Sequence, residues 1–370
     1  MNAPYSRILA ATLFLSGTSS VSAAPATPAP AASADCGASG GSYSADAQGA
    51  ACRLADELEK AFVYPDKGKA YAAALRAHVA AGKYRGMSVE DASRTMTADL
   101  QAVAPDGHLH VMRLPDDSDG PSRAGPRADF PLLEQSGWIA PGIAFIRINA
   151  FMRDPAETAA VAKFMADHAD AKAIIFDIRT HRGGGLDQMD VIFPWLFAKE
   201  TRLVTMAIRR SVEEEQGSPL GDTPSLRLVA GTPQEVVREH WATPNADPRL
   251  RDAKVYLLTS RRTGSAAEHF ALAMKHTGRA TLVGSRTSGA NHFGGGMELA
   301  GGLAAFVPVG RTYDPVTGKD WESVGVAPDV DVAPEVALEW ALKDLGVDAA
   351  TASGLSKSHA PTLSMEPRKM

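Results

Sequence analysis

The segment K-V-Y-L-L-T-S-R-R-T-G-S-A-A-E-H-F-A, residues 254–271, contains an apolar strand followed by the start of a helix. The run V-Y-L-L-T (255–259) is typical of a strand that is buried on both faces. Ser265 and Glu268 then have the spacing of a capping box. Because unpaired backbone N–H groups converge at a helix N-terminus, a serine there caps the helix or serves as a nucleophile. The segment by itself leaves both roles open.

The same pattern of strands and helices extends on both sides of this segment, across residues 137–345. Continuous apolar strands that alternate with helices predict a mostly parallel sheet covered on both faces. The predicted strands are residues 142–148, 173–178, 255–259 and 281–284, and the predicted helices are residues 155–169, 187–198 and the helix that opens at Ser265. A hairpin of residues 297–299 and 304–309 closes the series.

The remaining parts of the chain have other patterns. Residues 51–112 predict a helical N-terminal unit that ends in a turn at 105–107 and a short strand, and residues 113–136 predict a connector. Within the core, residues 200–250 are polar without a clean period, which predicts an insertion or a lid. Residues 346–370 predict a loose tail. The fold class is therefore α/β, with a small helical unit before the core.

Composition and charge exclude some classes of protein. The chain has 370 residues, 45% of them hydrophobic and 22% charged, as is ordinary for a globular protein. The formal net charge is −5 and no Lys/Arg stripe is present, so we expect no nucleic-acid partner. The triplet 183–185 lacks the G-x-G-x-x-G spacing, so we expect no nucleotide cofactor.

The first residues predict export. Residues 1–23 have the positive start, short apolar run and small-residue cleavage site of a signal peptide, and a Pro/Ala-rich linker covers residues 24–50. No later segment is long enough to span a membrane. Cys36 and Cys52 are the two cysteines of the chain, and an isolated pair in an oxidising compartment predicts a disulfide.

Four segments resemble motifs of the C-terminal processing (tail-specific) serine peptidases. They are D-I-R-T-H-R-G-G-G (177–185), T-G-S-A-A-E (263–268), G-S-R-T-S-G-A (284–290) and W-E-S-V-G-V-A-P-D (321–329), in the order of that family. The early segment D-G-H-L also resembles the branch that contains interphotoreceptor retinoid-binding protein and the tricorn core protease. The resemblance implies a ClpP/crotonase-like core. The residues between His110 and Trp138 are too few for the PDZ module of many members.

The resemblance also implies a set of site residues. Ala290 stands where the processing peptidases have their lysine base, so their Ser–Lys dyad is absent. The tricorn-like branch instead implies Ser265 as nucleophile, His108 as general base and Glu322 as the carboxylate that orients the site. A serine precedes the histidine in the tricorn pattern, whereas Gly107 stands here.

The oxyanion hole follows from the same resemblance. It implies backbone N–H groups of Gly183 or Gly184 and of Ala266, the residue after the nucleophile. His181 replaces the usual asparagine of the glycine-rich segment. His108 and His110 would share one face of a strand, but no third metal ligand accompanies them, so we expect no metal.

Together these features predict an exported serine peptidase with a peptide or protein substrate and no cofactor. One rival is a binding module for a hydrophobic ligand or peptide on the same fold, and another is an esterase that uses the same serine. The presence of His108, Ser265 and Glu322 favours an enzyme. The sequence does not indicate the cleavage specificity or the oligomeric state.

Overall fold

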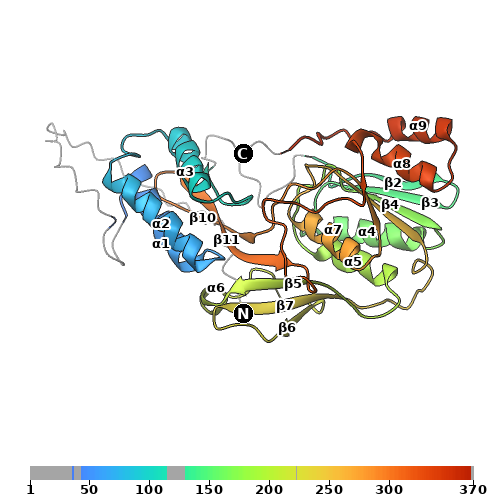
Figure 1. The fold of residues 1–370 in the computed structure, drawn as a ribbon, viewed down its shortest axis with the longest axis horizontal. Helices are drawn as coiled ribbons and strands as arrows, with labels where there is room; N and C mark the ends of the chain where they lie inside the picture. The colour runs from blue at the N-terminus through green and yellow to red at the C-terminus, as the bar shows by residue number, and fades with distance from the viewer. Residues whose placement is uncertain (1–35, 37–42, 115–129, 222, 368–370) are drawn as a thin grey trace, which may run out of the picture.

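The computed structural model describes residues 36, 43–114, 130–221 and 223–367. The predicted signal peptide, most of the predicted linker and much of the predicted connector lie outside these residues. Two six-stranded sheets and the helices around them form the molecule, and Figure 1 shows the N-terminal helices and the C-terminal helices at opposite ends of it.

The first sheet is the predicted α/β core. Its order is β12-β9-β8-β4-β3-β2, and every pair is parallel except β2 with β3. The strands are β2 (Leu133–Ala140), β3 (Ile143–Ile148), β4 (Ala173–Asp177), β8 (Lys254–Thr259), β9 (Thr281–Gly284) and β12 (Val330–Asp331). The central strands β3 and β4 are buried along their whole length, as their apolar sequences predict.

Helices cover both faces of this sheet. One face packs against α4 (Pro155–Asp167), α5 (Asp187–Leu196) and α7 (Ala266–His276). The other face packs against α8 (Ala337–Asp344) and α9 (Ala349–Ser358), after the short 3-10 helix η3 (Pro334–Val336). The prediction of a loose tail is therefore wrong for α9, which buries Ala352. Its few apolar residues gave no clear helical period.

The second sheet is antiparallel, with the order β1-β11-β5-β7-β6 and β10 paired to β11. Its strands are β1 (His110–Arg113), β5 (Thr201–Arg209), β6 (Leu226–Val229), β7 (Glu235–Ala242), β10 (Phe293–Glu298) and β11 (Leu303–Tyr313), with the short helix α6 (Arg210–Gln216) after β5. Residues 200–250 thus contain regular elements, β5, α6, β6 and β7, where the sequence predicted only an insertion or a lid without a clear period. Half-buried antiparallel strands alternate polar and apolar residues, so they lack the continuous apolar runs by which the core strands were predicted.

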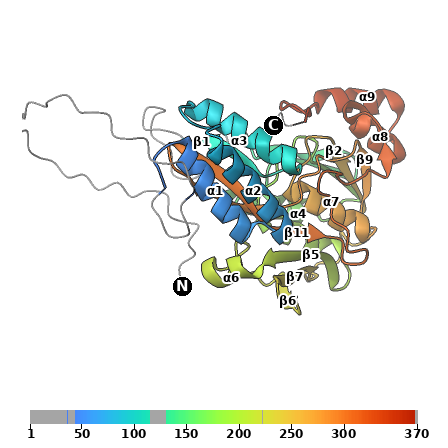
Figure 2. The ribbon, with the colours of Figure 1, turned by 60° about the vertical axis from the view of Figure 1, so that its left-hand side comes forward.

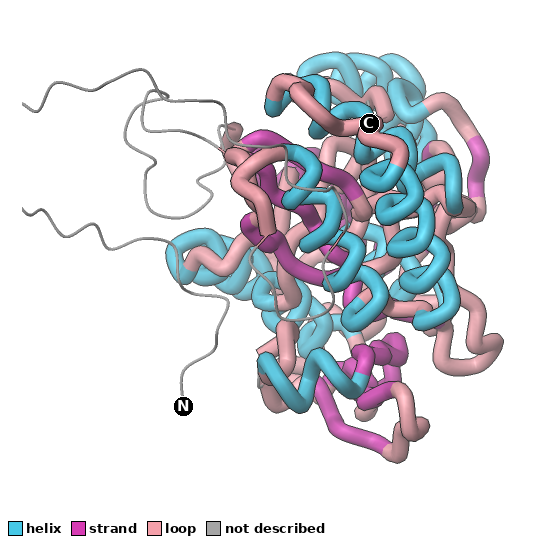
Figure 3. The backbone as a smooth tube through the Cα atoms, turned by 90° about the vertical axis from the view of Figure 1, so that its left-hand side faces the viewer, coloured by secondary structure: helices cyan, strands magenta, loops and turns pink. Residues whose placement is uncertain are grey.

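The predicted helical N-terminal unit is confirmed, and its helices are α1 (Ala47–Ala61), α2 (Pro65–Ala80) and α3 (Val89–Val103). They pack on β1 and β11, which Figure 2 shows behind them, and they share one core with Leu303, Ala305 and Val307 of β11. In the view from that end, helices and strands lie side by side on the near face of the molecule (Figure 3). The strand β1 therefore brings the chain around residues 106–110 to strands that follow residue 292.

The predicted disulfide is confirmed. Cys36 and Cys52 are bonded, with their Cα atoms 5.2 Å apart, so residue 36 is tied to the first helix. Among the described residues, no helix combines the length and the apolar character that a membrane span requires.

Candidate active site

Ser265 lies between strand β8 and helix α7 in an unusual backbone conformation. Its φ is 56° and its ψ is −121°, and only Ser323 shares a positive φ among the described residues other than glycine. Such a conformation costs free energy in a residue with a Cβ atom, and residues of this kind concentrate at functional sites. The turn therefore holds the serine in a position that an ordinary helix cap would not require.

Glu268 stabilises this conformation from behind. Its Oε2 accepts a hydrogen bond of 2.9 Å from the backbone N–H of Ser265, which is the carboxylate half of the predicted capping box. Both halves of the capping box are in place, although the Ser265 hydroxyl faces the N–H of Glu268 without a well-aligned hydrogen bond. Ser265 therefore belongs to the helix cap and also borders the cleft described below.

The carboxylate of Glu268 is fully buried and has five hydrogen-bond donors. Besides Ser265 they are the Thr287 and Ser288 hydroxyls and the backbone N–H groups of Gly289 and Ala290. Burial raises the pKa of Glu268 to about 7, and the hydrogen bonds from these donors limit the rise. One carboxylate thereby joins the nucleophile turn to residues 287–290.

Glu322 holds the next residues of the same segment. Its Oε2 accepts hydrogen bonds from the N–H groups of Asn291 (2.6 Å) and His292 (3.2 Å), and its Oε1 accepts one from Gly107 (2.7 Å). Burial is the main cause that raises the pKa of Glu322. Residues 287–292 are thus held between two carboxylates, one on the side of Ser265 and one on the side of the turn that carries His108.

Gly107 approaches this segment more closely than any other residue type could. A Cβ atom at position 107 would lie 2.9 Å from both the Cα and the Cβ of Ala290. The serine of the tricorn pattern therefore does not fit here without movement. Instead of a hydroxyl relay, Glu322 binds the backbone N–H of the residue that precedes His108.

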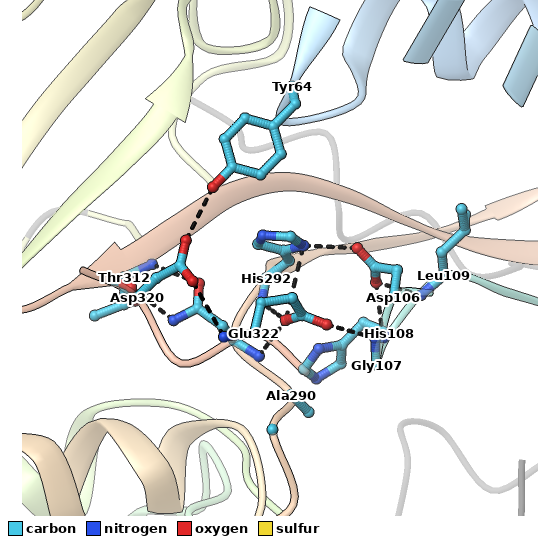
Figure 4. Close-up of polar contacts among 12 residues, drawn as sticks. Tyr64, Asp106, Gly107, His108, Leu109, Ala290, His292, Thr312, Asp320 and Glu322 are labelled. Atoms are coloured by element: carbon cyan, nitrogen blue, oxygen red, sulfur yellow. Dashed lines mark hydrogen bonds and ion pairs between the residues drawn. The ribbon is translucent and has the colours of Figure 1, made fainter. Parts of the chain in front are cut away.

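Asp106 organises the turn that presents His108 (Figure 4). Its Oδ1 accepts hydrogen bonds of 2.9 Å from the N–H groups of His108 and Leu109, and its Oδ2 lies 2.6 Å from Nδ1 of His292. Burial would raise the pKa of Asp106, but the hydrogen bond and the charge of His292 outweigh it and lower the pKa. The carboxylate is therefore a firm anchor for the turn.

The two sequence-predicted histidines lie on one side of strand β11. The ring of His108 is 5.4 Å from the ring of Phe306, and the ring of His110 is stacked on Phe306 at 6.3 Å. His108 precedes the strand β1, which begins at His110, so the two imidazoles meet at Phe306 without lying on one strand.

A group that the sequence did not reveal is formed by Asp106, His292 and Glu322. Among the described residues it is the one set of three whose donor atoms lie within 4.8 Å of one another, as a metal site would require. Here the carboxylates accept backbone N–H groups and Nδ1 of His292 binds Asp106. The arrangement is that of a hydrogen-bonded cluster that holds the His108 turn.

The predicted oxyanion residues lie beside Ser265. A Cβ atom on Gly183, whose φ is 101°, would come within 2.6 Å of the Ser265 Cβ, so this close approach requires glycine. Gly184 and Ala266 border the same cleft as Ser265, and neither N–H makes a hydrogen bond to the described residues. The N–H of Gly183 is engaged, because it donates to Nδ1 of His181 at 3.0 Å.

His181 is a fully buried neutral imidazole. Burial lowers its pKa to about 3, and its ring packs edge-on against Phe151 at 4.2 Å. Because Nδ1 accepts the Gly183 N–H, the ring proton resides on Nε2. The loop that carries His181 is anchored by a buried ion network, in which Asp177 binds both Arg147 (2.9 Å) and Arg179 (2.7 Å).

The cleft at Ser265 has a volume of about 1210 Å³. It lies between the glycine-rich loop, α5, the start of α7 and the segment that leads into β10, and its lining includes Phe151, Phe293 and Trp321. Its charged lining residues are Asp154, Glu157, Asp187, Asp190 and Arg153. The cleft is large enough for several residues of a polypeptide and has an acidic side.

Fold and site together define a protein of the α/β peptidase class, with a serine on a strained turn above a mostly parallel sheet. The sequence agrees with this class. Peptidase family S41 matches residues 142–332, which is just over half of the chain, and the chain therefore belongs to this family.

Two chloroplastic C-terminal processing peptidases each match about half of this chain. The carboxyl-terminal-processing peptidase 3 of Arabidopsis thaliana chloroplasts is 29% identical over 187 residues, or 50% of this chain and 31% of the relative. The chloroplastic C-terminal processing peptidase of Tetradesmus obliquus is 28% identical over 213 residues, or 56% of this chain and 39% of the relative. The matches thus span less than half the length of either relative.

A solved structure supports the fold. The structure of a candidate peptidase from Parabacteroides merdae covers 85% of this chain and 97% of its own, with a TM-score of 0.53 and 17% identity. At this identity the likeness concerns the fold alone. Because it covers 85% of the chain, the likeness extends beyond residues 142–332, the region matched by the family.

Sequence reasoning missed several residues that shape the site. The capping-box spacing predicts only that Glu268 caps the helix. In the structure its carboxylate accepts hydrogen bonds from five donors and so connects Ser265 to residues 287–290. Asp106 and His292 are 186 residues apart and gave no joint signal. The available signal was their position in the sequence: Asp106 stands in the predicted turn before His108, and His292 follows Ala290 by two positions.

Proposed function

We propose that this protein is an exported serine peptidase in which Ser265 attacks the peptide carbonyl and His108 acts as general base. His108 takes the hydroxyl proton as the Ser265 oxygen bonds to the carbonyl carbon, and later gives that proton to the leaving amine. A water molecule then hydrolyses the acyl-enzyme with the same histidine as base. Glu322 orients the His108 turn and favours the imidazolium that forms transiently.

The oxyanion of the tetrahedral intermediate would be held by backbone N–H groups. Gly184 and Ala266 are the donors that remain available at the cleft, and Gly183 joins them if His181 releases its N–H. Of the two glycines that the sequence left open as oxyanion donors, Gly183 and Gly184, this proposal therefore favours Gly184.

The observation that carries the proposal is the link between the two halves of the mechanism through residues 287–292. Ser265 and Ala290 share Glu268, while Gly107 lies against Ala290 and shares Glu322 with Asn291. The turn with His108 is therefore fixed relative to the nucleophile by hydrogen bonds on buried carboxylates. A binding module has no need of a strained serine and a histidine turn that are coupled in this way.

Export is supported by two features of the N-terminal region. A disulfide between Cys36 and Cys52 is typical of oxidising compartments, and residues 1–23 have a signal-peptide pattern. The substrate would be a polypeptide, as for the C-terminal processing relatives.

The proposal is tested with a fluorophosphonate probe and a set of unstructured peptides. We expect the wild type to be labelled and to cleave peptides, and Ser265→Ala to do neither. His108→Phe should lose at least about 10²-fold in kcat/KM, whereas His110→Phe, which alters the neighbouring ring against the same Phe306, should keep most of the activity. Absence of Ser265-dependent labelling and turnover would favour the binding module, and turnover of esters without peptides would favour the esterase.

A further inference from the structure

A second group of titratable side chains lies beside the cleft and consists of two buried histidines and the partly exposed Asp190, which also lines the cleft. His269 is on helix α7 one turn after Ser265, His240 is on strand β7 and Asp190 is on helix α5. Nε2 of His269 lies 2.8 Å from Nδ1 of His240, and Nε2 of His240 lies 2.8 Å from Oδ1 of Asp190. The three side chains form a chain of hydrogen bonds that crosses three elements.

Asp190, at one end of this series of hydrogen bonds, is held by two hydroxyl groups. The second oxygen of Asp190 accepts hydrogen bonds from the hydroxyls of Ser225 (2.8 Å) and Thr223 (3.1 Å). His240 is fully buried and its ring contacts Phe193. Because a carboxylate only accepts, Nε2 of His240 must carry a proton and donate it to Asp190.

His269, at the other end of this series of hydrogen bonds, borders the same cleft as Ser265, and its Nδ1 makes no hydrogen bond to the described residues. His269 as a whole is only 3% exposed, but this nitrogen is not among the fully buried polar atoms that lack a partner, so it keeps a small exposure at the cleft. With neutral His240, Nε2 of His269 donates to His240 and Nδ1 is a hydrogen-bond acceptor.

Burial lowers the pKa of His269 well below the usual value, and the neighbouring His240 adds to the effect. His269 is therefore neutral and offers a hydrogen bond but no charge. If His240 carries a second proton, the tautomer of His269 reverses and Nδ1 becomes a donor. A hydroxyl group can both donate and accept, so it satisfies this nitrogen in either state.

From this geometry we propose that His269 forms a specificity subsite for an uncharged, hydrogen-bonding side chain of the substrate, with threonine or serine as the best fit. The inference rests on the proposed peptidase function. The carboxylates on the lining of the cleft disfavour an acidic substrate side chain there. An apolar side chain of equal size would leave the imidazole nitrogen without a partner, which is the effect that makes hydrogen-bonding pockets selective.

The test uses pairs of peptides that differ only in threonine against valine, which have nearly the same shape. The pair is placed in turn at each of three positions on either side of the cleaved bond. We expect the wild type to prefer threonine at one position by about tenfold in kcat/KM, which is within the range for one hydrogen bond in a specificity pocket. His269→Phe should reduce this ratio to near one, and His269→Gln should retain part of it.

The threonine-to-valine ratio within one variant cancels any uniform change in rate, so a purely structural role of His269 would leave the ratio unchanged. His276→Phe, at the last turn of the same helix, is the matched control and should keep the wild-type ratio. If His269→Phe is inactive, His240→Phe replaces it, since it removes the partner that fixes the His269 ring, and the ratio should fall there as well.

The outcomes separate this inference from the proposed function. Peptide turnover that depends on Ser265 but shows no threonine preference at any position, or a preference that survives His269→Phe, would overturn the subsite and leave the peptidase standing. Absence of all Ser265-dependent turnover would overturn both.

Discussion

The backbone N–H of Gly183 donates a hydrogen bond of 3.0 Å to Nδ1 of His181. Gly183 lies directly against Ser265, where an oxyanion donor would be placed. The His181 imidazole thus accepts a backbone N–H that the proposed mechanism could use for the oxyanion. His181 stands where the family motif has an asparagine.

We predict that His181→Leu raises kcat. The substitution removes the ring nitrogen that accepts the Gly183 N–H and puts no other acceptor in its place, which leaves this donor available for the oxyanion. One such donor contributes about 10²–10³-fold to kcat in other serine peptidases, so part of that gain, at least about threefold, is expected here. Steady-state kinetics with one peptide would measure it. A folded variant whose kcat is equal to or lower than that of the wild type would contradict the prediction.

The same imidazole should make the protein sensitive to acid. Burial lowers the pKa of His181 to about 3, so below pH 6.5 the unfolded chain binds a proton that the folded chain does not. The stabilisation is complete above pH 6.5 and is lost as the pH falls toward 3. Between pH 7 and pH 5, the loss is about 2 kcal/mol at 1.36 kcal/mol per pKa unit.

His181→Leu is also the variant that isolates this effect. The free energy of unfolding of the wild type, minus that of His181→Leu, should fall by about 2 kcal/mol from pH 7 to pH 5. The raised pKa of Glu268 acts in the opposite direction, but it is present in both proteins and cancels. Urea unfolding at both pH values is the measurement, and a constant difference would show that His181 is not held neutral.

We predict that Gly107→Ala impairs catalysis more than stability. The new Cβ would lie 2.9 Å from the backbone of Ala290, so the turn with His108 must move away from the segment that Glu268 ties to Ser265. A displacement of this kind costs about 10²-fold in rate. Gly296→Ala is the control, because a Cβ there meets nothing within 4 Å. Equal kcat/KM in the two variants would show that the turn tolerates the shift.

We predict that Glu268→Gln both destabilises the protein and slows the reaction. Donors bind both carboxylate oxygens, so the amide group of glutamine faces an N–H or hydroxyl donor in either orientation. Unpaired buried donors cost about 1–3 kcal/mol each. Thermal unfolding and peptide kinetics would measure the two effects. A variant with the wild-type melting temperature and kcat would show that the carboxylate does not hold the Ser265 turn.

The sequence by itself determined the α/β core. The apolar strands at 173–178 and 255–259 require burial on both faces, and the helices between them supply the cover, so the pattern fixes a mostly parallel sheet. Ser265 at a helix start, the glycines beside it and the Cys36–Cys52 pair were also predictable, because each depends on a few neighbouring residues or on an isolated pair.

Only the tertiary structure decided how the site is assembled. The antiparallel sheet of residues 200–250 and the pairing of β1 with β11 bring the His108 turn to residues 287–292. Patterns in the local sequence do not indicate which distant strands pair. The links Asp106–His292, Gly107–Glu322 and His240–His269 join residues from 29 to 215 positions apart. Burial of a carboxylate or an imidazole is a property of the folded environment, so neither the raised pKa of Glu268 nor the lowered pKa of His181 could be deduced from composition or spacing.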